Sequence, residues 1–149
     1  MLNEQDFLPT TLEECVISDV LSKDKLDKIV SKVIPFPAFG KCGILLHGPY
    51  GTGKTTTARL IPELMEKARG GTEANYSFYS CAQGMNGSSL ISQIQVATQY
   101  VSFNNSGLHY SVLDEIDNLT EAAQAVILPF CKGARSRNVM QPWPVSASV

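Results

Sequence analysis

The stretch GPYGTGKTTT, residues 48–57, places three glycines within six positions and follows them with a lysine and three threonines. The pattern G-x-x-x-x-G-K-[ST], which is typical of loops that hold nucleotide phosphates, is matched by Gly48, Gly53, Lys54 and Thr55. The preceding run CGILLHG is apolar and ends in glycine, which indicates a strand buried on both faces of a parallel sheet. A strand before the motif and a helix after it form the context in which this pattern is specific.

Each residue type in this loop has a chemical reason. Glycines let backbone N–H groups turn toward phosphate oxygens, and the helix that follows presents the positive end of its dipole. Lys54 is predicted to contact the terminal phosphates of a nucleotide, and the hydroxyl of Thr55 is predicted to hold a magnesium ion. The nucleotide-binding residues predicted from this loop are Gly48, Pro49, Tyr50, Gly51, Thr52, Gly53, Lys54, Thr55 and Thr56.

Strand and helix patterns alternate beyond the loop. The aromatic-rich residues 76–81 predict a second strand, and residues 88–101 carry apolar side chains at helical spacing. The run LHYSVLDEID, residues 108–117, is apolar until it ends in acids, and a further helix follows it. This order predicts an α/β fold of the P-loop NTPase class, a parallel sheet flanked by helices.

Local signals also predict where the helices begin and end. An amphipathic helix is expected to start at residue 22 with Ser22 as its cap, and Thr120 is expected to cap a later helix. Because proline lacks a backbone N–H, Pro62 is expected to kink or end the helix after the loop, and Pro129 to stop the last one.

Two neighbouring acids stand where a phosphate loop needs a partner. Asp114 ends the third predicted strand, 60 residues after Lys54 (114 minus 54), and is predicted to hold magnesium together with Thr55. Glu115 follows it directly and is predicted to act on the water that attacks the terminal phosphate, either as general base or as the group that positions this water. The alternative interpretation is a polar helix start, which acids favour in any protein.

Composition excludes some classes of function. The 149 residues carry a formal net charge of −2, so nucleic-acid contact would need a local patch or partner subunits. The four cysteines have no paired spacing typical of a zinc site. The N-terminus lacks a basic region followed by an apolar run, so we expect a cytoplasmic protein, or a nuclear one in a eukaryote, with no membrane contact.

The pairing of GPYGTGKT with VLDEID resembles the AAA+ branch of P-loop ATPases. The upstream segment LPTTLEECVISDVLSKDKLDKIVS and the later DEIDNLTEAAQ are similar to replication clamp-loader ATPase subunits, so the resemblance covers roughly residues 7–126. It implies ATP and magnesium as cofactors, with Lys54 and Glu115 as catalytic residues and Thr55 and Asp114 as metal ligands. It also implies that Val16 and Ile17 offer an apolar wall to the base.

The same resemblance implies how the chain is organised and what it acts with. The length of 149 residues and the hydrophobic content predict one domain. With the resemblance, this is a single AAA+ domain over residues 1–149, divided into an N-terminal segment and helix (1–40), a phosphate-loop core (41–126) and an atypical tail (127–149). Partners would be other AAA+ subunits in a ring or arc, with a sliding clamp and primed DNA reached through the complex. A neighbouring subunit would supply the arginine finger, so the chain alone is expected to hydrolyse ATP weakly or not at all.

The tail departs from the family pattern. Members of the family continue with a buried strand, a phosphate sensor, an arginine finger and a helical lid, whereas here the chain reads ILPFCKGARSRNVMQPWPVSASV. Since Pro142 and Pro144 cannot donate hydrogen bonds, we expect this tail to be a poor central strand and the core to be truncated before the lid. Arg135 and Arg137 fit an arginine finger less well than a solvated basic loop.

Two other functions remain open from the sequence. A helicase-loader or transposition-type ATPase shares both motifs, and only the upstream segment PTTLEECV disfavours it. A nucleotide-binding or interaction fragment without catalysis would explain the unusual tail. Pairing of the tail between the two motif strands would favour the catalytic interpretation over the fragment.

Overall fold

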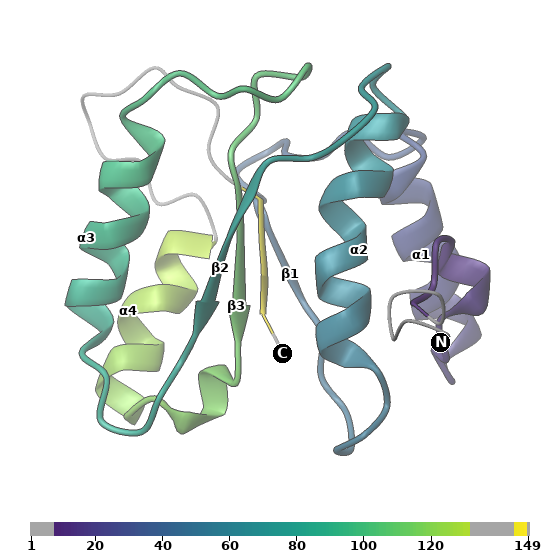
Figure 1. Cartoon of the computed structure of the whole chain (residues 1–149). Helices are drawn as coiled ribbons and strands as arrows, with labels where there is room; N and C mark the ends of the chain where they lie inside the picture. Colours follow the sequence, from purple (N-terminus) through teal and green to yellow (C-terminus); the bar gives the residue numbers. More distant parts are fainter. Residues whose placement is uncertain (1–7, 132–144, 149) are drawn as a thin grey trace, which may run out of the picture.

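The computed structural model describes residues 8–131 and 145–148. The sequence folds into a parallel four-stranded sheet with helices on both faces, as the alternation of patterns predicts (Figure 1). The strands are β1 (Gly43–Leu45), β2 (Tyr76–Ser80), β3 (Tyr110–Asp114) and β4 (Val145–Ser148). The helices are α1 (Val20–Val30), α2 (Lys54–Lys67), α3 (Gly87–Thr98) and α4 (Glu121–Cys131), with short 3-10 turns η2 (Leu12–Glu14) and η3 (Ile116–Asn118).

The order of strands across the sheet is β1-β4-β3-β2, and every neighbouring pair is parallel. The strand that leads into the phosphate loop and the strand that ends in the acids are therefore separated by β4 alone. Because the carboxyl ends of parallel strands meet at one edge of a sheet, the loop after β1 and the acids after β3 share that edge.

The expectation that the tail makes a poor central strand is wrong. Val145–Ser148 forms β4, which pairs with β1 through Gly43 and Ser146 and with β3 through Tyr110 and Val145. The physical reason is that both prolines precede the strand. Each residue from 145 to 148 has a backbone N–H to donate. Most of the rest of the tail, Arg135 and Arg137 included, lies outside the described residues.

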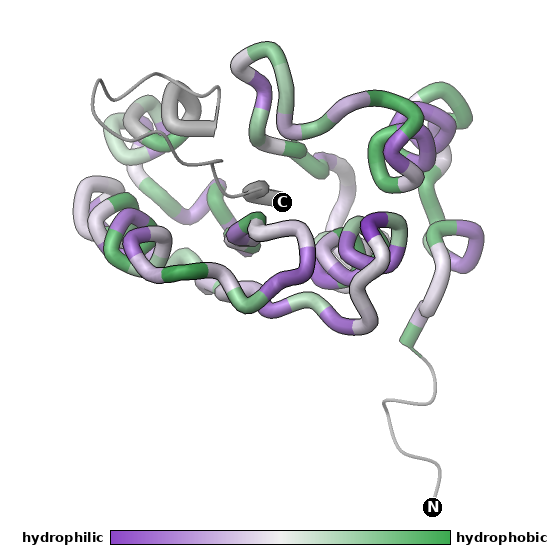
Figure 2. Tube along the Cα trace, turned by 90° about the horizontal axis from the view of Figure 1, so that it is seen from above, coloured by the Kyte–Doolittle hydropathy of each residue, from purple (hydrophilic) through white to green (hydrophobic). Residues whose placement is uncertain are grey.

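The two larger of the three hydrophobic clusters in the described residues lie between the sheet and its two layers of helices. One joins α1 and α2 to the sheet, and its buried members include Leu26, Ile61 and Met65. The other joins α3 and α4 to the opposite face, with Leu90 and Ile127 at its centre. Figure 2, seen from above, shows α3 and α4 on one side of the strands, α1 and α2 on the other, and hydrophobic and hydrophilic residues alternating along their turns.

The cap of the first helix differs from the expected one. The helix begins at Val20, and Asp19 is the N-cap, with a side chain that accepts a hydrogen bond of 3.0 Å from the backbone N–H of Ser22. Ser22 therefore lies inside the first turn and its hydroxyl also donates to Asp19. An ionised carboxylate is a strong acceptor for the free N–H groups of a helix start, which explains why the aspartate takes this position.

Neither proline ends its helix. The helix α2 runs without a break through Pro62, and α4 continues past Pro129 to Cys131. In α2 the neighbours Ile61 and Met65 are fully buried, so packing of this face offsets the roughly 3 kcal/mol that an internal proline costs a helix. The Thr120 cap is confirmed, since its hydroxyl accepts from the backbone N–H of Ala123 at 3.2 Å.

No helix within the described residues is long and apolar enough to cross a membrane.

Candidate functional site

The phosphate loop leaves β1 and turns directly into α2. Gly51 and Gly53 have φ angles of 74° and 77°, in the left-handed region that favours glycine, and Gly53 is the N-cap of α2. Lys54 and Thr55 are therefore the first two residues of the helix, at the end where free N–H groups and the helix dipole favour an anion. This geometry fits the phosphate groups of a nucleotide.

The Lys54 side chain bends back over its own loop. Its Nζ donates to the carbonyl oxygen of Pro49 at 2.6 Å and lies 5.8 Å from the centre of the Tyr50 ring. Thr52 donates its hydroxyl to the same Pro49 carbonyl at 2.9 Å. The ammonium group is thus held by a neutral acceptor and an aromatic face, both of which a phosphate would outcompete.

Thr55 and Asp114 meet across the edge of the sheet. The Thr55 hydroxyl donates to both carboxylate oxygens of Asp114, at 3.0 and 3.1 Å. Hydroxyl and carboxylate oxygens are ligands that magnesium prefers, so these two residues fit that ion. The described residues contain no group of three or more His, Cys, Asp or Glu side chains able to hold a metal. Phosphate oxygens and water would therefore complete the coordination.

Glu115 adopts an unusual backbone conformation beside Asp114. Its φ and ψ of 57° and 41° lie in the left-handed region, which costs most residues other than glycine roughly 1–2 kcal/mol. Its exposed carboxylate accepts a hydrogen bond from Asn118 Nδ2 at 3.2 Å, and the same Nδ2 lies 3.2 Å from the carbonyl oxygen of Cys81. Asn118 therefore links Glu115 to the end of β2.

A cavity of about 450 Å³ joins these groups. The Tyr50 hydroxyl donates to Asp117 Oδ2 at 3.4 Å, which connects the phosphate loop to the segment that follows β3. The residues that line the cavity are Leu45, Leu46, His47, Gly48, Tyr50, Gly51, Thr52, Gly53, Lys54, Thr55, Asp114, Glu115, Ile116 and Asp117.

Some predicted residues lie elsewhere, and the sequence analysis missed others. Val16 is 81% exposed and Ile17 packs against the α1 and α2 cluster, and neither is among the residues that line this cavity. His47 and Asp117 do line it, although the sequence analysis assigned them no role. Asp117 is the last acid of DEID, so its position two residues after Glu115 was a usable signal.

The electrostatics of the site reach Cys81 at the end of β2. The pKa of this buried thiol is raised, first by burial and then by the charges of Asp114 and Glu115. The thiol therefore stays protonated at neutral pH and packs as an apolar group beside the acids.

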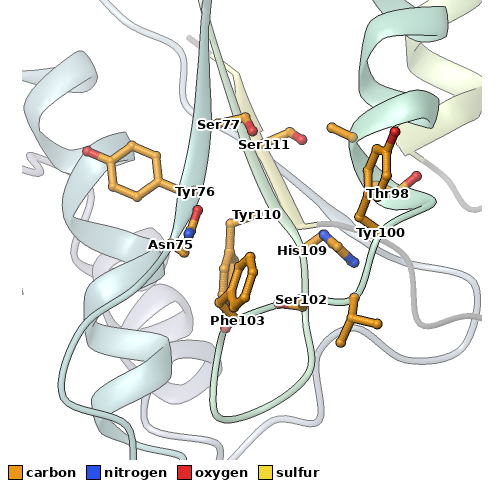
Figure 3. Close-up of a pocket in the computed structure, with 12 residues that line it drawn as sticks. Asn75, Tyr76, Ser77, Thr98, Tyr100, Ser102, Phe103, His109, Tyr110 and Ser111 are labelled. Carbon is orange, nitrogen blue, oxygen red and sulfur yellow. The ribbon is translucent and has the colours of Figure 1, made fainter.

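A second cavity of about 180 Å³ lies at the other end of the strands (Figure 3). Figure 3 shows Ser77 and Ser111 of β2 and β3 on one side of it, and Thr98 and Tyr100 at the end of α3 on the other. No lysine, arginine, aspartate or glutamate is among its described lining residues. The charged groups that a magnesium nucleotide requires are gathered at the first cavity.

Comparison with known proteins agrees with this geometry. Residues 43–137 match the family described as AAA domain (dynein-related subfamily), a span that runs from β1 through the phosphate loop and both acids. No curated protein matches the chain. Because the match covers well over half of the 149 residues, the chain belongs to the AAA family of P-loop ATPase domains, in the dynein-related subfamily.

Proposed function

We propose that this chain is an ATP-binding and ATP-hydrolysing module that uses magnesium. The observation that carries the proposal is the hydrogen bond of 3.0 Å from the Thr55 hydroxyl to Asp114 Oδ1, in the lining of a cavity that Lys54 also lines. Phosphoryl transfer requires a hydroxyl and an ammonium, here at the start of α2, together with a carboxylate, here at the end of β3.

Two side chains must move for the reaction to proceed. Lys54 leaves the Pro49 carbonyl and turns to the terminal phosphates, which offer a charged acceptor in place of a neutral one. Glu115, which already lines the cavity, releases Asn118 so that its carboxylate accepts a proton from the attacking water. Magnesium, when bound, supplies positive charge that offsets the charge on the transferred phosphoryl group.

Calorimetry of the pure chain with ATP and magnesium tests the binding step. We expect wild type to bind, and Lys54→Ala to weaken binding by at least about tenfold because the variant loses a charge-assisted contact. The matched control is Lys41→Ala, which removes one exposed lysine outside the cavity and should leave binding unchanged. A folded wild type that does not bind ATP would overturn the proposal.

Within this function we propose a clamp-loader type of ATPase acting in DNA replication. The support is the likeness of the upstream segment and of DEIDNLTEAAQ to those subunits. The partners would be other AAA subunits that donate an arginine, and through them a sliding clamp and primed DNA. The base would lie against Val16 and Ile17, and the high exposure of Val16 leaves it available for that contact.

The clamp-loader assignment is tested by measuring the ATPase rate with and without the proposed partners. The pure chain should hydrolyse ATP slowly. Clamp-loader subunits with clamp and primed DNA should raise the hydrolysis rate at least tenfold, because a donated arginine accelerates phosphoryl transfer by up to about 10³–10⁵. Stimulation by a helicase or transposase partner instead would favour the helicase-loader or transposition alternative. The position of β4 between the motif strands supports a catalytic module over a non-catalytic fragment.

A further inference from the structure

Glu66 is a buried charged residue near the end of α2, far from the phosphate loop. It is 0% exposed and is the single acidic or basic residue among the buried polar side chains of the described chain. Its Oε2 accepts a hydrogen bond of 3.1 Å from the backbone N–H of Ser106. Its Oε1 accepts from the hydroxyls of Ser106 and Tyr110. Burial of a carboxylate is costly unless such donors satisfy it, so these contacts are strong constraints.

The partners of Glu66 belong to the start of the acid-bearing strand. Tyr110 is the first residue of β3 and is itself buried. The pKa of Tyr110 is raised, first by burial and next by its hydrogen bond to Glu66, so the phenol keeps its proton and remains a donor. Ser106 lies in the loop that leads into the same strand.

The carboxylate has little freedom to move. The backbone N–H of Gly71 donates to the Glu66 carbonyl at 2.8 Å, and a Cβ at Gly71 would lie 3.2 Å from both that carbonyl oxygen and Oε2. Asn105 adds a second tie between the loop and the end of α2, since its Nδ2 donates to the Arg69 carbonyl at 3.0 Å. The end of α2 and the start of β3 are thus fixed to each other by several directional bonds.

The helix α2 and the strand β3 therefore meet at both of their ends. Thr55 and Asp114 touch at one end, and Glu66 and Tyr110 at the other. At 1.5 Å per helical residue, Thr55 and Glu66 are about 16 Å apart along the helix. At about 3.3 Å per strand residue, Tyr110 and Asp114 are about 13 Å apart. Because the helix and the strand are both stiff, a shift of α2 along β3 at Glu66 also shifts Thr55 relative to Asp114.

We propose that Glu66 is a positioning residue that sets the longitudinal register of α2 against β3, so that Thr55 and Asp114 meet at the distance magnesium requires. The proposal deepens the proposed function and rests on it for its role in ATP chemistry. An apolar residue of similar size would fill the same space, but it would not fix the register, because apolar contacts have no direction.

Calorimetry of ATP binding in magnesium and in EDTA separates positioning from general destabilisation. Under the proposed function, binding in EDTA would rest on the phosphate loop, and the Thr55 and Asp114 pair would add the magnesium-dependent part. We expect Glu66→Gln to reduce that part about tenfold, since small misplacements at a site have effects of this size or larger, with less than twofold change in EDTA. Tyr110→Phe should likewise weaken ATP binding in magnesium more than in EDTA, by a smaller factor than Glu66→Gln.

Ser102→Ala is the matched control. The Ser102 hydroxyl donates to the Leu108 carbonyl at 2.7 Å and accepts from the backbone N–H of Asn104 at 3.1 Å. Both partners lie in the same loop rather than in α2, so loss of this hydroxyl should leave both affinities unchanged. Equal weakening in magnesium and in EDTA, or no weakening in either, would overturn the role of Glu66. If Glu66→Gln does not fold, Tyr110→Phe provides the same comparison.

A second measurement does not depend on ATP. In urea unfolding, we expect Thr55→Val to lower the stability of wild type but to have a much smaller effect in the Glu66→Gln or Tyr110→Phe background, because the Thr55 contact depends on the register. Additive effects would contradict the proposal. A wild type that folds but fails to bind ATP would refute the proposed function alone, and this coupling would still decide the role of Glu66.

Discussion

Thr55 and Asp114 stand 59 residues apart in the chain, yet the Thr55 hydroxyl lies 3.0 Å from Oδ1 and 3.1 Å from Oδ2 of Asp114. One residue is in the first turn of α2 and the other ends β3. Two motifs that are separate in the sequence thus become one site, and the cavity beside them is large enough for phosphate groups and a metal.

Thr55→Val should weaken binding of ATP in magnesium by about tenfold or more. Valine has nearly the same shape as threonine but lacks the hydroxyl, so the metal would lose one oxygen ligand. Thr55→Ser keeps the hydroxyl and should bind nearly as well as wild type. Calorimetry of the three proteins makes the comparison, and equal affinities for the valine and serine variants would exclude the hydroxyl as a ligand.

Glu115→Asn should raise stability and remove any hydrolysis of ATP. Asparagine tolerates the left-handed conformation found at φ 57°, so part of the roughly 1–2 kcal/mol of backbone strain is relieved. It lacks the carboxylate that would accept a proton from water. Glu115→Ala is the control, because it also loses the carboxylate but keeps the strain.

Thermal unfolding and phosphate release check both parts of this prediction. The two variants should be equally inactive, and only the asparagine variant should unfold at a higher temperature than wild type. A stability gain in the alanine variant of the same size would show that the charge of Glu115, rather than its backbone conformation, is what costs stability.

The phosphate loop and the acids could be predicted because each is a short motif with a local cause. Gly53 and Lys54 need only their neighbours to form the start of a helix, and Asp114 ends an apolar run that could be recognised as a strand. The fold class followed from the order of these elements. The prediction of a parallel sheet flanked by helices is confirmed.

The missed features depend on contacts between distant segments. The four residues VSAS of β4 have little strand character of their own, and their pairing with β1 and β3 comes from the two strands that flank them. Glu66 looks like an ordinary solvated residue of an amphipathic helix until Ser106 and Tyr110 are brought to it. In the same way, burial of the neighbours of Pro62 outweighs the tendency of this proline to end a helix.

Asp19 should make the stability of the protein depend on acid pH. Its pKa is lowered from 3.8 by hydrogen bonds from the hydroxyl and then the backbone N–H of Ser22. A folded-state pKa below the unfolded value stabilises the fold above the unfolded pKa, and this contribution is lost as the pH falls through the folded one. We expect Asp19→Asn to keep the cap but lose this dependence.

The measurement is the melting temperature of both proteins from about pH 5 to about pH 3. The melting temperature of wild type should fall more on acidification than that of Asp19→Asn. The difference between the two falls separates the contribution of Asp19 from that of the other carboxylates. Parallel pH profiles would show that the Asp19 contacts do not persist in solution.

Gly87→Ala should destabilise the protein, although alanine normally favours a helix over glycine by about 1 kcal/mol. Gly87 is the first residue of α3, and a Cβ there would lie 2.8 Å from the Cα and Cβ of Ala123 and 2.9 Å from its carbonyl oxygen. Two of these three atoms are backbone of α4, so the helices must separate, at a cost of about 1–3 kcal/mol.

Urea unfolding checks this prediction, with Ser88→Ala as the control because Ser88 is the next residue of the helix and is exposed. Adding Ala123→Gly to Gly87→Ala should restore only part of the loss, since it removes one of the three clashing atoms and leaves the two backbone atoms in place. Full recovery would mean that α4 shifts easily against α3. A stabilised Gly87→Ala protein would mean that the two helices do not pack this closely in solution.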